Sequence, residues 1–241
     1  MQFDPKKNYS FYQPPVDGNS ILAVFENPTW KEQLLNRPVM GETGIHLSLL
    51  LDILRNMRCE FSEHFRNQLY KYHIGIVNAI RFSGDLSNVK QCVLEKLIEE
   101  NGEILAHAVN NSKLVLLFGE NAQNAYIWYR KHSGINLLKQ HQCVISVYHL
   151  SNRALAQIGN ASAISKFLKR KSLVGFIPLL PMESKLAVIA EYIAYTYERQ
   201  NNCPFSFEDF QSFIKPFLNT NTNTNEMPED FGTISVIGGY Q

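Results

Sequence analysis

The segment ILAVFENPTW (Ile21–Trp30) decides how the rest of this chain is interpreted. Its first five residues are apolar and have the length of a strand, and they lead directly into polar turn residues. Four further segments follow, most of which also end an apolar run in a polar turn: RPVMGETG (Arg37–Gly44), HIGIVNAIRF (His73–Phe82), KLVLLFGENA (Lys113–Ala122) and QCVISVYHLSNR (Gln142–Arg153). An open α/β sheet binds its ligand at the carboxyl ends of its strands. The polar residues at the predicted strand ends are therefore candidates for a site: Glu26, Asn27, Asn78, Gly119, His149 and Ser151.

Strand-like runs alternate with helical periodicity along most of the chain, which is typical of βαβ units. We predict strands at Ile21–Phe25, His73–Ile80, Leu114–Phe118 and Cys143–Tyr148. We predict helices at about Ile45–Met57, Val89–Asn101, Ala122–His132, soon after Asn152, and at Glu183–Gln200 and Phe207–Leu218, with a loop at Arg37–Gly44 and a short helix or loop at Glu60–Lys71. The expected fold is a three-layer α/β/α sandwich with a short, mainly parallel central sheet of about four strands.

Composition divides the chain into three parts. Residues 1–19 contain Pro5, Pro14, Pro15 and Gly18 and are expected to form an extended N-terminal arm. Residues 20–218 are expected to form a single α/β domain, in which the C-terminal helices cover the same core. Residues 219–241 begin with a polar run rich in Asn and Thr and are expected to be a flexible tail.

Bulk composition limits the class of protein more than its partner. The 241 residues are 45% hydrophobic and 12% aromatic, which is ample for a core. The net charge of +1 neither supports nor excludes a nucleic-acid partner. Four cysteines lie far apart without a CxxC pair, so we expect no metal, iron–sulfur cluster or other cofactor. The N-terminus lacks an apolar h-region and no segment approaches the length of a membrane span, so we expect a cytoplasmic protein with free thiols that does not contact membranes. We also expect a monomer.

Taken in order, the five segments resemble those of the uracil-DNA glycosylase superfamily, over roughly Ile21 to Arg153. FENPT (Phe25–Thr29) resembles the first motif, which reads GQDPY, GINPG or GEAPG in different branches. Glu26 matches the glutamate of the GEAPG type, and Asn27 matches the asparagine of the GINPG type. The remaining matches are Arg37–Gly44 to RPFVGxAG, His73–Ile80 to the strand that ends in a base-reading asparagine, Leu116–Ala122 to LLWGxxA and His149–Arg153 to HPSPL.

This resemblance implies a DNA glycosylase that hydrolyses the N-glycosidic bond of uracil or a related deaminated base, as in base excision repair. Asn78 would read the Watson–Crick edge of the flipped base, because one amide offers both a donor and an acceptor. His149 would donate to uracil O2, and Glu26 or Asn27 would position the attacking water. Ser151 would hold a phosphate, and Arg153 would fill the gap left in the DNA. The implied substrate-binding residues are Phe25, Pro28, Val39, Gly41, Asn78, Ser151 and Arg153.

Several departures from the family pattern leave other functions open. Phe25 and Thr29 replace both glycines of the first motif, Val39 replaces the aromatic that would stack on the base, and Leu150 replaces the proline of the last motif. The cysteines of the iron–sulfur branch are absent. The alternative is a catalytically weak or inactive protein with the same fold that binds nucleic acid, a nucleotide or a protein partner. A third hypothesis is another hydrolase that acts on a small nucleoside-like ligand.

Overall fold

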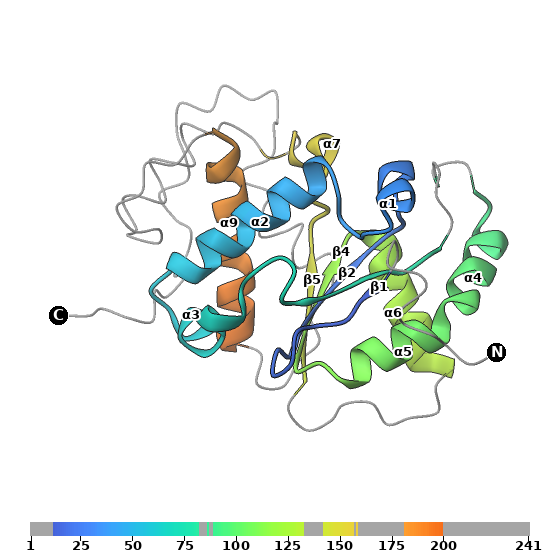
Figure 1. Cartoon of the computed structure of the whole chain (residues 1–241), viewed down its shortest axis with the longest axis horizontal. Coiled ribbons are helices and arrows are strands. Elements are labelled where there is room, and N and C mark those ends of the chain that lie inside the picture. Colours follow the sequence, from blue (N-terminus) through green and yellow to red (C-terminus); the bar gives the residue numbers. More distant parts are fainter. Residues whose placement is uncertain are drawn as a thin grey trace.

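A five-stranded sheet forms the middle layer of the molecule (Figure 1). The computed structural model describes residues 12–81, 86, 89–132, 142–156, 158 and 181–199. The strands are β1 (Tyr12–Gln13), β2 (Ile21–Phe25), β3 (Gly75–Asn78), β4 (Leu114–Phe118) and β5 (Cys143–Val147), in the order β1-β3-β2-β4-β5. Strands β2 to β5 run parallel, and β1 pairs antiparallel with β3 at one edge. The prediction of an α/β fold with a mainly parallel sheet is confirmed.

Helices cover both faces of the sheet. The helices between β2 and β3 are α1 (Trp30–Leu35), α2 (Glu42–Asn56), α3 (Glu60–Phe65) and the 3₁₀ turn η1 (Arg66–Gln68). Those between β3 and β5 are α4 (Gln91–Glu100), α5 (Gly102–Asn110) and α6 (Glu120–His132), and α7 (Asn152–Leu155) and α9 (Pro181–Arg199) follow β5. No helix of the described part is long and apolar enough to cross a membrane.

The two faces of β2 belong to two separate cores. Ile21, Ala23 and Phe25 pack with α2, α3 and α9, whereas Leu22 and Val24 pack with α4, α5 and α6. All five side chains are at most 3% exposed. Burial on both faces explains why the strand is a continuous apolar run rather than an alternating one.

Strands β2 and β4 form the topological switch point of the sheet. The chain leaves β2 through α2 and α3, which pack on one face, and leaves β4 through α6, which packs on the other. Since β2 and β4 are direct neighbours, the segments that follow their adjacent carboxyl ends diverge to opposite faces of the sheet. Ligands of open α/β sheets bind at such positions. The segments that follow β2 and β4 are therefore the natural place for a site.

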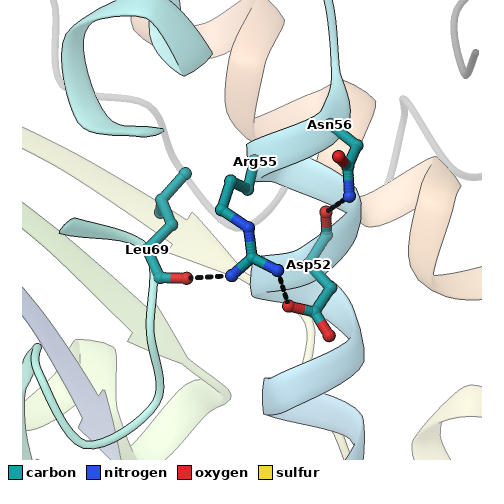
Figure 2. Close-up of polar contacts among 4 residues, drawn as sticks. All are labelled: Asp52, Arg55, Asn56 and Leu69. Atoms are coloured by element: carbon teal, nitrogen blue, oxygen red, sulfur yellow. Dashed lines mark hydrogen bonds and ion pairs between the residues drawn. The ribbon is translucent and has the colours of Figure 1, made fainter. Parts of the chain in front are cut away.

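Arg55 fixes the path of the chain into β3 from the last turn of α2 (Figure 2). Its guanidinium donates to Asp52 Oδ1 at 2.5 Å and to the Leu69 carbonyl at 3.2 Å. The same group lies 4.5 Å from the centroid of the Tyr70 ring. Asn56 donates to the Asp52 carbonyl at 2.8 Å. These contacts attach the loop before β3 to α2 and so help to set where β3 begins.

The four predicted parallel strands agree closely with the observed ones, whereas β1, α1 and α5 were not predicted. Strand β1 has only two residues and depends on backbone pairing with β3, which no residue pattern shows. The predicted helices after Ile45 and Ala122 begin earlier in the structure, at Glu42 and Glu120. The helix Phe207–Leu218, the tail 219–241 and residues 1–11 of the predicted arm lie outside the described residues.

Glu191 in α9 predicts a loss of stability as the pH rises from about 4.5 to 7. Burial, with Glu198 nearby, raises the pKa of Glu191 from 4.5 to about 7. In this range the folded state holds a proton that the unfolded state has released, so the free energy of unfolding falls as the pH rises. We expect a decrease of about 1–3 kcal/mol, measured by denaturant unfolding across this range.

Glu191→Gln should make this pH dependence shallower, because the amide does not titrate. Part of the pH dependence should remain in this variant, because burial also raises the pKa of Glu198. Glu95→Gln on the exposed face of α4 is the matched control and should leave the dependence unchanged. Equal slopes for the wild type and Glu191→Gln would contradict the prediction.

Candidate functional site

Phe25 lies at the centre of the carboxyl ends, between two of the residues that the sequence singles out. Asn78 is its direct neighbour in register on β3, and its side chain is on the same face of the sheet. The Phe25 ring stacks on Phe118 of β4, with centroids 4.7 Å apart and planes 5° from parallel. His149, after β5, meets the Phe25 ring edge-on at 6.4 Å between centroids. The structure thus places Asn78 and His149 on either side of Phe25, at the same end of the sheet.

The His149 ring is held in one neutral form. Its Nδ1 accepts the backbone N–H of Ser151 at 3.1 Å, so in the neutral ring the proton is on Nε2. Burial lowers the pKa of His149, and the nearby Glu26 carboxylate partly opposes this effect. The net direction is downward, so the ring is neutral at neutral pH. His149 therefore presents Nε2–H as a hydrogen-bond donor.

Helix α2 anchors the loop that carries His149. The ring of His46, buried in α2, bonds through Nδ1 to the Leu150 carbonyl at 2.7 Å. At the start of the same helix, Glu42 accepts a hydrogen bond from Asn152 at 2.7 Å. Sequence reasoning missed His46. The one available signal was a polar ring on an otherwise apolar helix face.

Ser151 and Arg153 follow on the short helix α7. The Ser151 hydroxyl accepts the backbone N–H of Ala154 at 3.3 Å and so caps this helix. Arg153 is exposed on its surface. Ser151 is linked to the central cluster through its backbone N–H, which donates to His149 Nδ1.

Glu26 lies beside Gly119, the residue that directly follows β4. Gly119 has φ +94°, and a Cβ atom at this position would collide with the Glu26 carboxylate. The glycine therefore provides both the backbone conformation and the space for the carboxylate. The backbone carbonyls of Phe25 and Glu26 accept the N–H groups of Ala79 and Ile80 at 2.7 and 2.9 Å.

Asn27 is half-buried after Glu26, and Pro28 is buried before α1. Pairing between the segments after β2 and β3 thus continues beyond the strands. This pairing holds Glu26 and Asn27 close to the end of β3. The structure therefore brings both candidates for positioning the water to the carboxyl ends of the central strands.

The loop that contains Val39 is held by Glu32 of α1. Glu32 and Thr29 form a capping box, and the second oxygen of the Glu32 carboxylate accepts the Val39 N–H. Burial raises the pKa of Glu32, and its bonds to backbone N–H groups oppose the rise. Val39 is 2% exposed and has φ +53°, a rare conformation for a β-branched residue. Such strain, on the order of 1–3 kcal/mol, is most common at functional sites.

Val39 packs in the same core as Phe25, whereas Gly41 is exposed at the N-cap of α2. The structure therefore places Val39 in the core on the Phe25 face of the sheet, and Gly41 at the surface where the chain turns into α2.

Within the described residues, no group of three or more His, Cys, Asp and Glu side chains could hold a metal ion. Cys59, Cys92 and Cys143 are free thiols. Burial raises the pKa of Cys59 to about 11 and that of Cys143 to about 12, so neither forms a reactive thiolate at neutral pH.

Comparison with models of known protein families finds no match for this chain. A search of curated proteins finds no significant match either.

Proposed function

We propose that this protein binds a nucleobase flipped out of DNA and hydrolyses its N-glycosidic bond, with uracil or a related deaminated base as substrate. The observation that carries the proposal is the position of Asn78 and of a neutral His149 on either side of Phe25. The order of the sequence segments that resemble the uracil-DNA glycosylase superfamily supports the same assignment.

The leaving base determines what His149 must do. As the bond between the sugar carbon and the base nitrogen breaks, negative charge accumulates on uracil O2. A neutral imidazole that donates through Nε2–H stabilises this charge without being an acid strong enough to protonate the base beforehand. A preorganised donor of this kind contributes about 3–4 kcal/mol to the transition state. The Ser151 bond to Nδ1 and the His46 bond to Leu150 keep this donor in place.

Asn78 would select the base. Its amide can donate to uracil O4 and accept from N3–H, whereas cytosine presents the opposite pattern on these atoms. Asn78 is 1% exposed, so the residue is fully buried. The neighbouring Asn101 donates to the carbonyls of Asn78 and Ala79 at 2.6 and 3.2 Å. These two bonds fix the backbone at Asn78, which carries the amide.

Glu26 and Asn27 would act on the opposite side of the reaction. The sugar develops positive charge, which a carboxylate stabilises, and an amide or carboxylate can orient the attacking water. Glu26 is close enough to His149 for its charge to affect the imidazole. The Glu26 carboxylate and the His149 imidazole therefore influence each other's charge.

The test is incubation of the full chain with labelled oligonucleotides that contain one uracil, hypoxanthine or mismatched base, in single- and double-stranded form. Cleavage of the abasic product by alkali reports excision. We expect product from at least one deaminated base and none from the undamaged strand. Absence of product from every substrate would refute the enzymatic proposal.

A second candidate function, binding without turnover, is favoured by Phe25. Its ring occupies the position between Asn78 and His149 and is fixed by stacking on Phe118. A protein with this filled position could recognise an exposed base or nucleotide without closing around the sugar. Retention of the uracil oligonucleotide without an abasic product would support this function.

A further inference from the structure

Two cations share the ring of Tyr72, close to the start of α2. The Arg37 guanidinium lies 4.0 Å from the ring centroid, and Lys71 Nζ lies 4.8 Å from it. The Tyr72 hydroxyl contacts Met40 Sδ at 3.1 Å. The ring is therefore held between the chain that enters β3 and the loop that enters α2. It positions both positive groups at one place on the molecule.

No acid of the described chain forms an ion pair with either cation. Neither Arg37 nor Lys71 forms a side-chain hydrogen bond or an ion pair with another described residue. Glu32 is close enough for its charge to affect Lys71, but its oxygens already accept the N–H groups of Thr29 and Val39. Burial and the Arg37 charge lower the pKa of Lys71 to about 8, while Glu32 opposes the shift. Holding these like charges together costs free energy, and a bound anion would remove that cost.

The first turn of α2 adds to the same positive region. Lys71 Nζ lies directly against Gly44, where a Cβ atom would collide with both this amine and the Val39 carbonyl. Gly41, the N-cap of α2, provides no side-chain cap for the first N–H groups of the helix. The first turn carries one acid, Glu42, whose carboxylate accepts a hydrogen bond from Asn152. Gly44 thus lets the Lys71 amine approach a helix end that also favours negative charge.

We propose that Arg37 and Lys71, positioned by Tyr72 at the start of α2, bind the phosphate group of a nucleic acid or nucleotide. The planar guanidinium offers two parallel donors to two phosphate oxygens, and the ammonium offers a point charge to a third. The Val39 carbonyl beside Lys71 connects this phosphate site to the core that contains Phe25. The phosphate site does not depend on hydrolysis, because a protein that only binds bases would use it in the same way.

Binding of three probes tests the phosphate site. The probes are a uracil-free thymidine oligonucleotide without terminal phosphate, thymidine 5′-monophosphate, and thymidine as the phosphate-free reference. Affinity is measured for the full chain by fluorescence anisotropy or titration calorimetry at low salt. We expect Arg37→Gln and Lys71→Gln each to weaken binding of a phosphate-bearing probe at least 10-fold. For the oligonucleotide, each should also reduce the slope of log affinity against log salt by about one.

Lys31→Gln is the matched control. Lys31 also lies over an aromatic ring, 5.8 Å from the Trp30 centroid, and no second cation of the described residues lies over that ring. This variant removes the same charge and should retain wild-type affinity within about 2-fold. Lys71→Arg should restore most of the binding, and thermal unfolding checks that each variant is folded.

The pattern of binding identifies the source of the phosphate. Preference for the oligonucleotide indicates a backbone phosphodiester, and preference for thymidine 5′-monophosphate indicates a terminal phosphate. Equal losses in Lys71→Gln and Lys31→Gln would show only non-specific charge attraction and would overturn the proposal. The proposal would also be overturned if the wild type bound the oligonucleotide and thymidine 5′-monophosphate no more tightly than it binds thymidine. If the Arg37 and Lys71 variants alone lose phosphate binding, and the wild type excises no base, the phosphate site stands and only the proposed enzymatic function is refuted.

Discussion

Replacing His149 by alanine is expected to slow uracil excision by about 10²–10³-fold, which is the usual cost of removing one preorganised donor. Binding of the uracil oligonucleotide should change by no more than a few-fold, because the donor acts mainly on charge that appears in the transition state. The measurement is single-turnover excision under saturating enzyme, with affinity determined separately by anisotropy. A large fall in rate with little change in affinity is the expected signature.

His132→Ala provides the control for this prediction. His132 is exposed at the end of α6, where it bonds to the Trp128 carbonyl at 2.8 Å. Helix α6 starts at the carboxyl end of β4, so its last turn lies away from the candidate site. An excision rate that is the same for His149→Ala and the wild type, with both proteins folded, would remove His149 from the mechanism.

Asn78→Asp is expected to weaken recognition of uracil by about 10–100-fold, corresponding to about 1–3 kcal/mol for an unpaired buried group. The carboxylate keeps an acceptor but loses the N–H donor that uracil O4 requires. Lowering the pH protonates the new carboxyl group and returns a donor. The loss relative to the wild type should therefore become smaller at lower pH. The concentration dependence of single-turnover excision gives the strength of uracil recognition, and repeating it between pH 5 and 8 gives the pH dependence of the loss.

Asn111→Asp is the matched substitution for Asn78→Asp. Asn111 is exposed after α5, at the amino end of β4, and donates to the His107 carbonyl at 2.8 Å. It should leave uracil recognition unchanged at every pH. Because Asn78 is buried, denaturant unfolding must accompany the assay. A folded Asn78→Asp protein with wild-type recognition would show that this amide does not read the base.

The strands could be predicted well because each carries its signal locally. Ile21–Phe25 and Leu114–Phe118 are continuous apolar runs buried on both faces, and a polar residue or a glycine ends each of them. Helix α1 could not be found by periodicity, because Trp30, Leu34 and Leu35 are exposed. Its stability depends on the capping box of Thr29 and Glu32. The helix α5 does carry a periodic apolar face, at Ile104, Leu105, Ala108 and Val109, and was missed.

The candidate site likewise has a part that local sequence predicts and a part that depends on contacts between distant segments. Glu26 and His149 could be selected because each directly follows a predicted strand. Asn78 could be selected because it is a polar residue inside the apolar run of the predicted strand His73–Ile80. The sequence could not predict the contacts between distant segments. The bond from His46 to Leu150 joins residues 104 positions apart. The positive φ of Val39 and the shared ring of Arg37 and Lys71 likewise depend on where separate loops meet.

The packing of α9 on α2 has a consequence for the order in which this protein can fold during synthesis. Helix α2 ends at residue 56, but α9, which covers its apolar face, begins at residue 181. The ribosome therefore exposes Leu47, Leu50 and Leu54 for more than a hundred residues of elongation before their partner emerges. At about 5–20 residues per second this interval lasts several seconds or more. Helix α2, which anchors the candidate site through His46, therefore gains its packing against α9 only at the end of that interval.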